Sequence, residues 1–139
     1  MKIMIDINVL LDVAQKREPY YRFSSIVMSE VMKNKVVGAV PSHALTTLYY
    51  LVEKSSEREP ANEFTDRLLA HFDIVAADRS AFVRARNLPI DDFEDAVVAS
   101  LAEIAKCNFI VTRNVPDFEN SPVIAISPEE FIKNHVTIE

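Results

Sequence analysis

Short apolar runs alternate with longer amphipathic segments along the whole sequence, and this alternation constrains the fold most. Strands that alternate with helices join in parallel, so the pattern predicts an α/β fold. We expect a three-layer α/β/α sandwich with a central parallel sheet of four or five strands. A length of 139 residues suits one domain, residues 1–139, with its own core. The expected strands are residues 2–5, 36–40, 73–76, 109–112 and 123–126, and the expected helices are residues 8–14, 19–33, 42–54, 61–70, 79–86, 92–105 and 128–134.

Bulk charge excludes a protein that coats nucleic acid electrostatically. The chain has 15 Lys and Arg against 21 Asp and Glu, which gives a net charge of -6. A local basic rim around an acidic centre is still compatible with this balance. For most of the basic candidates, however, a solvated surface charge is the favoured interpretation: Lys16, Arg17, Lys33, Lys35, Arg84, Arg86 and Arg113.

Two residues that occur once each exclude further classes. Gly38 is the single glycine, so neither a dinucleotide-binding GxGxxG motif nor a P-loop can be written in this chain. Cys107 is the single cysteine, which excludes an intrachain disulfide and a cysteine-based zinc site, and we expect it to be buried. No signal peptide or membrane span is visible, so we expect a cytoplasmic protein without membrane contact.

Three carboxylates stand close to the predicted strand ends. Asp6 directly follows the run at residues 3–5, Asp117 follows the strand that begins at residue 109, and Asp95 begins a long apolar helix. The carboxyl ends of parallel strands open on one edge of a sheet, where α/β proteins place their sites. Carboxylates that converge there repel one another unless a cation lies between them, and Mg²⁺ takes oxygen ligands of this kind. The sequence therefore predicts metal-dependent phosphate chemistry.

Each of these acids also has a structural interpretation. Asp6 fits a helix N-cap about as well as a ligand, Asp95 completes a pattern similar to a capping box, and Asp117 suits a turn. The prediction of a site therefore depends on their joint placement. Neighbouring acids are interpreted as caps or surface groups, with Glu94 as the first candidate for an auxiliary ligand: Asp91, Asp92 and Glu94.

Three segments resemble a known family in order and spacing: residues 5–12 (IDINVLLD), Asp95-Ala96, and residues 112–118 (TRNVPDF). Together they resemble a PIN domain, and within that family the VapC-type toxins of type II toxin–antitoxin pairs. The resemblance implies an endoribonuclease that uses Mg²⁺ or Mn²⁺ and has an RNA substrate. It also implies a cognate antitoxin protein as partner, and a homodimer for which the helix at residues 19–33 offers apolar surface.

The resemblance also assigns roles to individual residues. It implies that Asp6, Asp95 and Asp117 bind the metal and carry catalysis. Two asparagines become polar supports of this centre, and Thr112 becomes a contact to water or to a ligand. The supporting asparagines are Asn8 and Asn114.

One position departs from the family pattern. Thr47 stands where the family usually has a Glu, and Glu53 points to a different helix face. His43 lies one turn before Thr47 and is either a surface residue or a ligand, phosphate contact or proton carrier at the site. Weaker metal binding, supported by Glu94 or Asp91, is one consequence. The alternative is a catalytically weak or inactive module that binds RNA or protein, and a phosphatase or phosphoacceptor domain that uses Asp6 fits poorly.

Overall fold

The structure is a computed structural model that describes residues 1–137. Within these residues, five strands form one parallel sheet in the order β3-β2-β1-β4-β5. This confirms the predicted parallel sheet and its alternation with helices. The strands are β1 (Lys2–Ile5), β2 (Val37–Pro41), β3 (Asp73–Val75), β4 (Phe109–Val111) and β5 (Ile124–Ile126). The helices are α1 (Ile7–Ala14), α2 (Tyr21–Met32), α3 (Ser42–Ser55), α4 (Arg58–His71), α5 (Arg79–Arg86), α6 (Phe93–Ile104), the 3₁₀ helix η1 (Val115–Phe118) and α7 (Pro128–His135).

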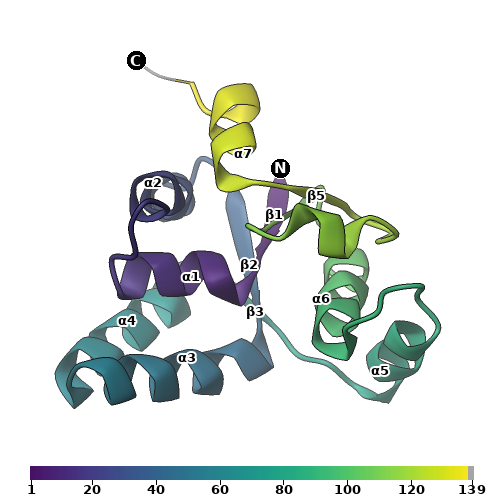
Figure 1. Ribbon diagram of the computed structural model, residues 1–139, viewed down its shortest axis with the longest axis horizontal. Coiled ribbons are helices and arrows are strands. Elements are labelled where there is room, and N and C mark those ends of the chain that lie inside the picture. Colours follow the sequence, from purple (N-terminus) through teal and green to yellow (C-terminus); the bar gives the residue numbers. More distant parts are fainter. Residues whose placement is uncertain (138–139) are drawn as a thin grey trace.

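Helices cover both faces of the sheet and create two cores. Helices α1 to α4 and α7 pack on one face, and α5 and α6 pack on the other (Figure 1). Side chains along β1 alternate between them, because Ile3 and Ile5 belong to the first core and Met4 to the second. A parallel sheet that is buried on both faces needs apolar residues at consecutive positions, which explains the continuous apolar runs in the sequence.

Short polar side chains define where several helices begin. Asp6, Asp78, Asp92 and Ser127 occupy the N-cap positions of α1, α5, α6 and α7, and each side chain accepts a hydrogen bond from a backbone N–H of the first turn. The cap at Asp92 agrees with the capping pattern predicted before α6. Helix α6 then buries every residue from 96 to 102, as its nearly continuous apolar sequence predicts.

Two helix starts differ from the prediction by more than one residue. Helix α2 begins at Tyr21 instead of Pro19, because a turn precedes it in which the Tyr21 N–H donates to the Arg17 carbonyl at 2.7 Å. Helix α4 begins at Arg58, so Pro60 lies in its first turn, where a missing N–H removes no helical hydrogen bond. Among the helices of residues 1–137, none has both the length and the apolar character needed to cross a membrane.

Gly38 and Cys107, the single glycine and the single cysteine, both lie in packed regions. A Cβ added to Gly38 in β2 would lie 2.7 Å from two ring atoms of Phe72 and 2.8 Å from Cγ1 of Val31, so this position needs a residue without a side chain. Cys107 is buried as predicted, and this burial raises the pKa of its thiol to about 11. Both residues therefore serve packing.

The central strands β1 and β4 bring two distant segments together. Chain connections leave them in opposite directions, toward β2 and β3 on one side and toward β5 on the other. Ile5 pairs with Val111 at the carboxyl ends of the two strands, and the Asp6 N–H donates to the Val111 carbonyl at 3.0 Å. The next residues, Asp6 and Thr112, therefore emerge side by side at the topological switch point, where open α/β sheets bind ligands.

Candidate active site

Asp6 is a buried carboxylate at the centre of the carboxyl edge. Only 5% of the residue is exposed, and its Oδ1 accepts a 2.8 Å hydrogen bond from the Ile7 N–H at the start of α1. Desolvation raises the pKa of Asp6, while hydrogen bonds to its oxygens oppose this effect. Asp6 is thus an N-cap, as its structural interpretation predicted, and also a desolvated acid beside the switch point.

A polar network holds the second oxygen of Asp6. Its Oδ2 accepts a 2.8 Å hydrogen bond from the Thr112 hydroxyl and a 3.1 Å bond from the Asn8 side-chain amide. The Thr112 oxygen in turn accepts from the Asn114 N–H at 3.0 Å, and Asn8 Oδ1 accepts from the Arg113 N–H at 3.4 Å. The network therefore links the start of α1 to the segment that leaves β4, and it fixes the direction of the Asp6 carboxylate.

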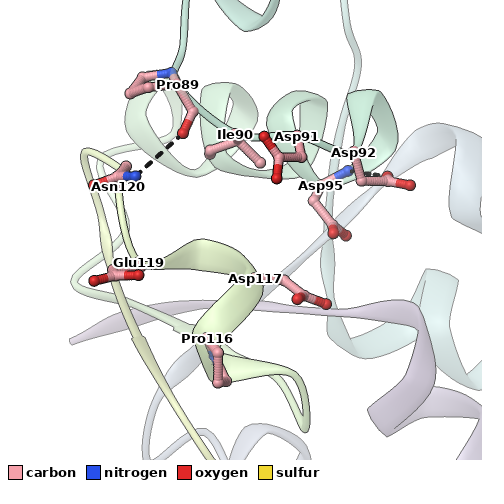
Figure 2. Close-up of a pocket in the computed structure, with 9 residues that line it drawn as sticks. All are labelled: Pro89, Ile90, Asp91, Asp92, Asp95, Pro116, Asp117, Glu119 and Asn120. Carbon is pink, nitrogen blue, oxygen red and sulfur yellow. Dashed lines mark hydrogen bonds between the residues drawn. The ribbon is translucent and has the colours of Figure 1, made fainter.

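Asp95 and Asp117 share a pocket beside this network. The pocket has a volume of about 290 Å³, and the two carboxylates extend into the same space, one from α6 and one from η1 (Figure 2). The Asn120 amide donates to the Pro89 carbonyl at 3.3 Å and joins two of its walls. Acids predominate among the lining residues, which are Pro89, Ile90, Asp91, Asp92, Asp95, Pro116, Asp117, Glu119 and Asn120.

The electrostatics connect this pocket to Asp6. Burial raises the pKa of Asp95 to about 7, and the negative charge of four other acids adds to the effect. Asp6 does not line the pocket, yet its charge raises the pKa of Asp95 more than that of any other acid does. The remaining contributions come, in decreasing order, from Asp92, Asp117 and Glu94. The acids therefore form one interacting cluster that a cation would stabilise.

The donor chemistry of this cluster fits a hard divalent cation, since its ligand atoms are carboxylate oxygens. Burial raises the pKa of Asp95, and repulsion by the other acids adds to this effect, as expected for carboxylates that share a site. Within residues 1–137, however, no three His, Cys, Asp or Glu side chains already lie close enough together to hold a metal ion. Binding a cation would therefore require these carboxylates to draw closer.

The auxiliary candidates lie in different environments. Glu94 is exposed in the first turn of α6, and its charge raises the pKa values of both Asp6 and Asp95. Asn8, Thr112 and Asn114 all belong to the network around Asp6. Thr47 is exposed on α3, its hydroxyl donates to the His43 carbonyl at 3.3 Å, and neither residue lines the pocket.

An ion pair between Arg113 and Asp12 was missed by the sequence reasoning. Arg113 is not a solvated surface charge, because its Nε donates to Oδ2 of the fully buried Asp12 at 2.8 Å. A signal for it exists in the sequence: Asp12 is a lone acid within the apolar segment 9–14, and such a buried acid requires a partner. That this partner is Arg113, 101 residues away, follows only from the fold.

Comparisons with known proteins agree with this architecture. A family model described as "PIN domain" matches residues 2–116. The curated protein "Ribonuclease VapC1" of Aquifex aeolicus (strain VF5) is 22% identical over 142 residues, which span 99% of this chain and 97% of that protein.

Solved structures share the fold at low sequence identity. VapBC2 from Rickettsia felis, bound to a DNA fragment from its promoter, matches with a TM-score of 0.66 and 21% identity, over 91% of this chain and 98% of that one. DNA-bound VapBC from Salmonella typhimurium matches with a TM-score of 0.68 and 19% identity, over 92% of this chain and 98% of that one. Two independently solved chains therefore have the same fold.

Proposed function

The chain belongs to the PIN domain family, and on that premise we propose that it is a metal-dependent endoribonuclease that hydrolyses RNA phosphodiesters. The observation that carries the proposal is the acid cluster at the switch point, where burial, together with the charges of Asp6, Asp117 and two further acids, raises the pKa of Asp95 to about 7. The similarity to a protein named as a ribonuclease, over nearly the full length of both chains, supports the assignment.

Asp6, Asp95 and Asp117 would hold Mg²⁺ or Mn²⁺. When bound, such a cation supplies an activated water and neutralises charge that develops on the phosphate. The protein contributes the orientation of its acids: Thr112 and Asn8 hold Oδ2 of Asp6, so this carboxylate is already directed. Asp117 is exposed and Asp95 half-buried, which leaves the open side of the cluster accessible to a polymer.

The acid cluster also sets the order of binding. Without a cation, the carboxylates at the pocket repel a phosphate, since like charges at close range are unfavourable. The cation therefore binds before RNA. Removal of divalent cations should weaken RNA binding as well as stop cleavage, and a filter-binding assay with and without a chelator distinguishes these two effects.

The partners follow from the same proposal. We propose an antitoxin protein as the cognate partner, supported by the VapBC assemblies among the structures with this fold. We also propose a homodimer. Expression of the chain alone should arrest growth, and co-expression of a small protein encoded next to it should relieve the arrest. Light scattering on the purified chain measures the dimer.

The decisive experiment for the activity uses pure protein and RNA. We expect endonucleolytic fragments of a structured RNA with Mg²⁺ or Mn²⁺ and none with EDTA. The alternative is a catalytically weak or inactive module, for which Thr47 in place of the usual Glu is the specific observation. RNA binding without fragments at any divalent cation concentration would establish this alternative instead.

A further inference from the structure

The ion pair between Asp12 and Arg113 has a fully buried carboxylate. No part of Asp12 is exposed, and its Oδ2 accepts from Arg113 at 2.8 Å and from the Ser24 hydroxyl at 3.3 Å. Its Oδ1, which is also buried, has no hydrogen-bond partner among the described residues. Desolvating two charges and leaving one oxygen unpaired opposes folding.

Arg113 is held on a second side by an aromatic ring. Its guanidinium lies over Tyr20 at 4.0 Å from the ring centroid, and 23% of its side chain is exposed. A planar guanidinium that stacks on a ring and donates to a carboxylate has one favoured orientation, unlike a flexible ammonium group. The pair therefore fixes the orientation of the Arg113 side chain in addition to the electrostatic attraction between the two charges.

The position of the pair connects it to the candidate site. Asp12 lies in α1, the helix that Asp6 caps and that contains Asn8. Arg113 lies between two residues of the polar network. The Thr112 hydroxyl donates to Asp6, and the Asn114 N–H donates to the Thr112 oxygen. The ion pair is thus a second link between the same two segments that the polar network joins at the carboxyl edge of the sheet.

We propose that the Asp12–Arg113 pair is a positioning element, which holds the segment 112–114 in register with α1 so that Asp6 keeps its direction. The geometry of this segment does not depend on the proposed function, whereas the consequence for cation binding rests on it. Apolar side chains of similar volume would stabilise the fold at least as well as a buried ion pair. Apolar side chains would not form the directional hydrogen bond by which Arg113 ties the segment 112–114 to Asp12.

Amide hydrogen exchange on the cation-free protein tests the positioning directly. The Arg113 N–H donates to Asn8 and the Asn114 N–H to Thr112. In Asp12→Asn we expect both amides to exchange about tenfold faster, while amides of β4 keep their protection. The matched control is Glu103→Gln, which breaks the exposed ion pair with Arg84 at 2.9 Å in the same chemical way and should leave both amides unchanged.

A double variant separates positioning from stability. Asp12→Leu combined with Arg113→Met removes both charges and keeps a similar side-chain volume, so we expect it to fold even if Asp12→Asn does not. In this double variant, amides 113 and 114 should still exchange faster, and calorimetric Mn²⁺ affinity should fall about tenfold or more.

Each outcome decides the proposal. A double variant with wild-type exchange at residues 113 and 114, or with wild-type Mn²⁺ affinity, would show that the pair only stabilises the fold and would overturn the positioning role. If the wild-type protein binds no Mn²⁺ at all, the proposed function fails, and the exchange measurement alone then supports or overturns the positioning of the segment.

Discussion

The Thr112 hydroxyl donates a 2.8 Å hydrogen bond to Oδ2 of Asp6, although 106 residues separate the two in the sequence. The pairing of Ile5 with Val111 at the ends of β1 and β4 places them side by side. Because Thr112 is fully buried, this bond is shielded from water. The direction of the Asp6 carboxylate thus depends on the register of two central strands.

Replacing Thr112 by Val tests this dependence. The substitution keeps the shape of the side chain but removes the donor to Asp6 and the acceptor for the Asn114 N–H. We expect the free energy of unfolding to fall by about 1–3 kcal/mol. Mn²⁺ affinity, measured by calorimetry, should fall about tenfold. Thr46→Val is the control, because the Thr46 hydroxyl is exposed and donates only to a backbone carbonyl of α3; equal Mn²⁺ affinity in both variants would count against the role of Thr112.

The pKa of Asp95 predicts a pH dependence of stability without metal. Folding raises this pKa from 3.8 to about 7, so the folded protein binds the proton more tightly than the unfolded chain. Stability from this group is therefore present at low pH and is lost as the pH rises from about 4 toward 7. Solvent screens the half-buried carboxylate, so the loss should be modest.

The substitution Asp95→Asn should remove this loss of folding stability at higher pH. Urea denaturation of the metal-free protein at about pH 5 and about pH 8 measures it, and the variant should gain stability relative to the wild type at the higher pH. The same dependence on pH in both proteins would show that folding does not raise the pKa of Asp95. We also expect Asp95→Asn and Asp117→Asn to bind Mn²⁺ more weakly than the wild type.

The position of Thr47 supports a test by gain of function. If the acid cluster is a weakened version of a four-acid centre, Thr47→Glu should add a ligand, tighten Mn²⁺ binding and leave cleavage level or higher. Repulsion in the cation-free site should lower its melting temperature. Thr46→Glu, also exposed on α3, is the matched control. Unchanged Mn²⁺ affinity in Thr47→Glu would show that Thr47 does not border the cluster and that the alignment of α3 with the family pattern is wrong.

Gly38 supports a prediction about the fold alone. A Cβ at this position meets the Phe72 ring and Val31, so Gly38→Ala should destabilise the protein by about 1–3 kcal/mol in chemical denaturation. If the contact with Phe72 is the cause, Phe72→Leu should cost less in the Gly38→Ala background than in the wild type. Additive effects of the two substitutions would contradict this explanation.

The elements were predictable because their signals are local. The short apolar runs that form β1 and β4 lie between polar residues. At the start of α6, the Asp92 side chain accepts a hydrogen bond from the backbone N–H of Asp95, three residues later. The start of α4 was predicted three residues too late, because the polar residues up to Pro60 indicate a loop, whereas the helix begins at Arg58 and tolerates Pro60 in its first turn.

The site was only partly predictable, because its geometry depends on sheet order. Alternation indicates a parallel sheet but does not say that β1 lies beside β4, and that neighbourhood is what joins Asp6 to Thr112. The pairing of Asp12 with Arg113 and the contribution of Asn120 to the pocket also depend on tertiary packing. The roles of Asp6, Asp95 and Asp117 in catalysis stay predictions.

The measurement that tests the account most directly is RNA cleavage by Asp6→Asn with Mn²⁺. Asn caps helices as well as Asp does, so the variant should fold, and removing a desolvated charge should leave its metal-free melting temperature level or higher. Asp78→Asn is the matched control, because Asp78 also caps a helix but is exposed before the start of α5 and does not line the acidic pocket. We predict that Asp78→Asn cleaves RNA like the wild type and that folded Asp6→Asn produces no Mn²⁺-dependent fragments; full cleavage by folded Asp6→Asn would contradict the proposed active site.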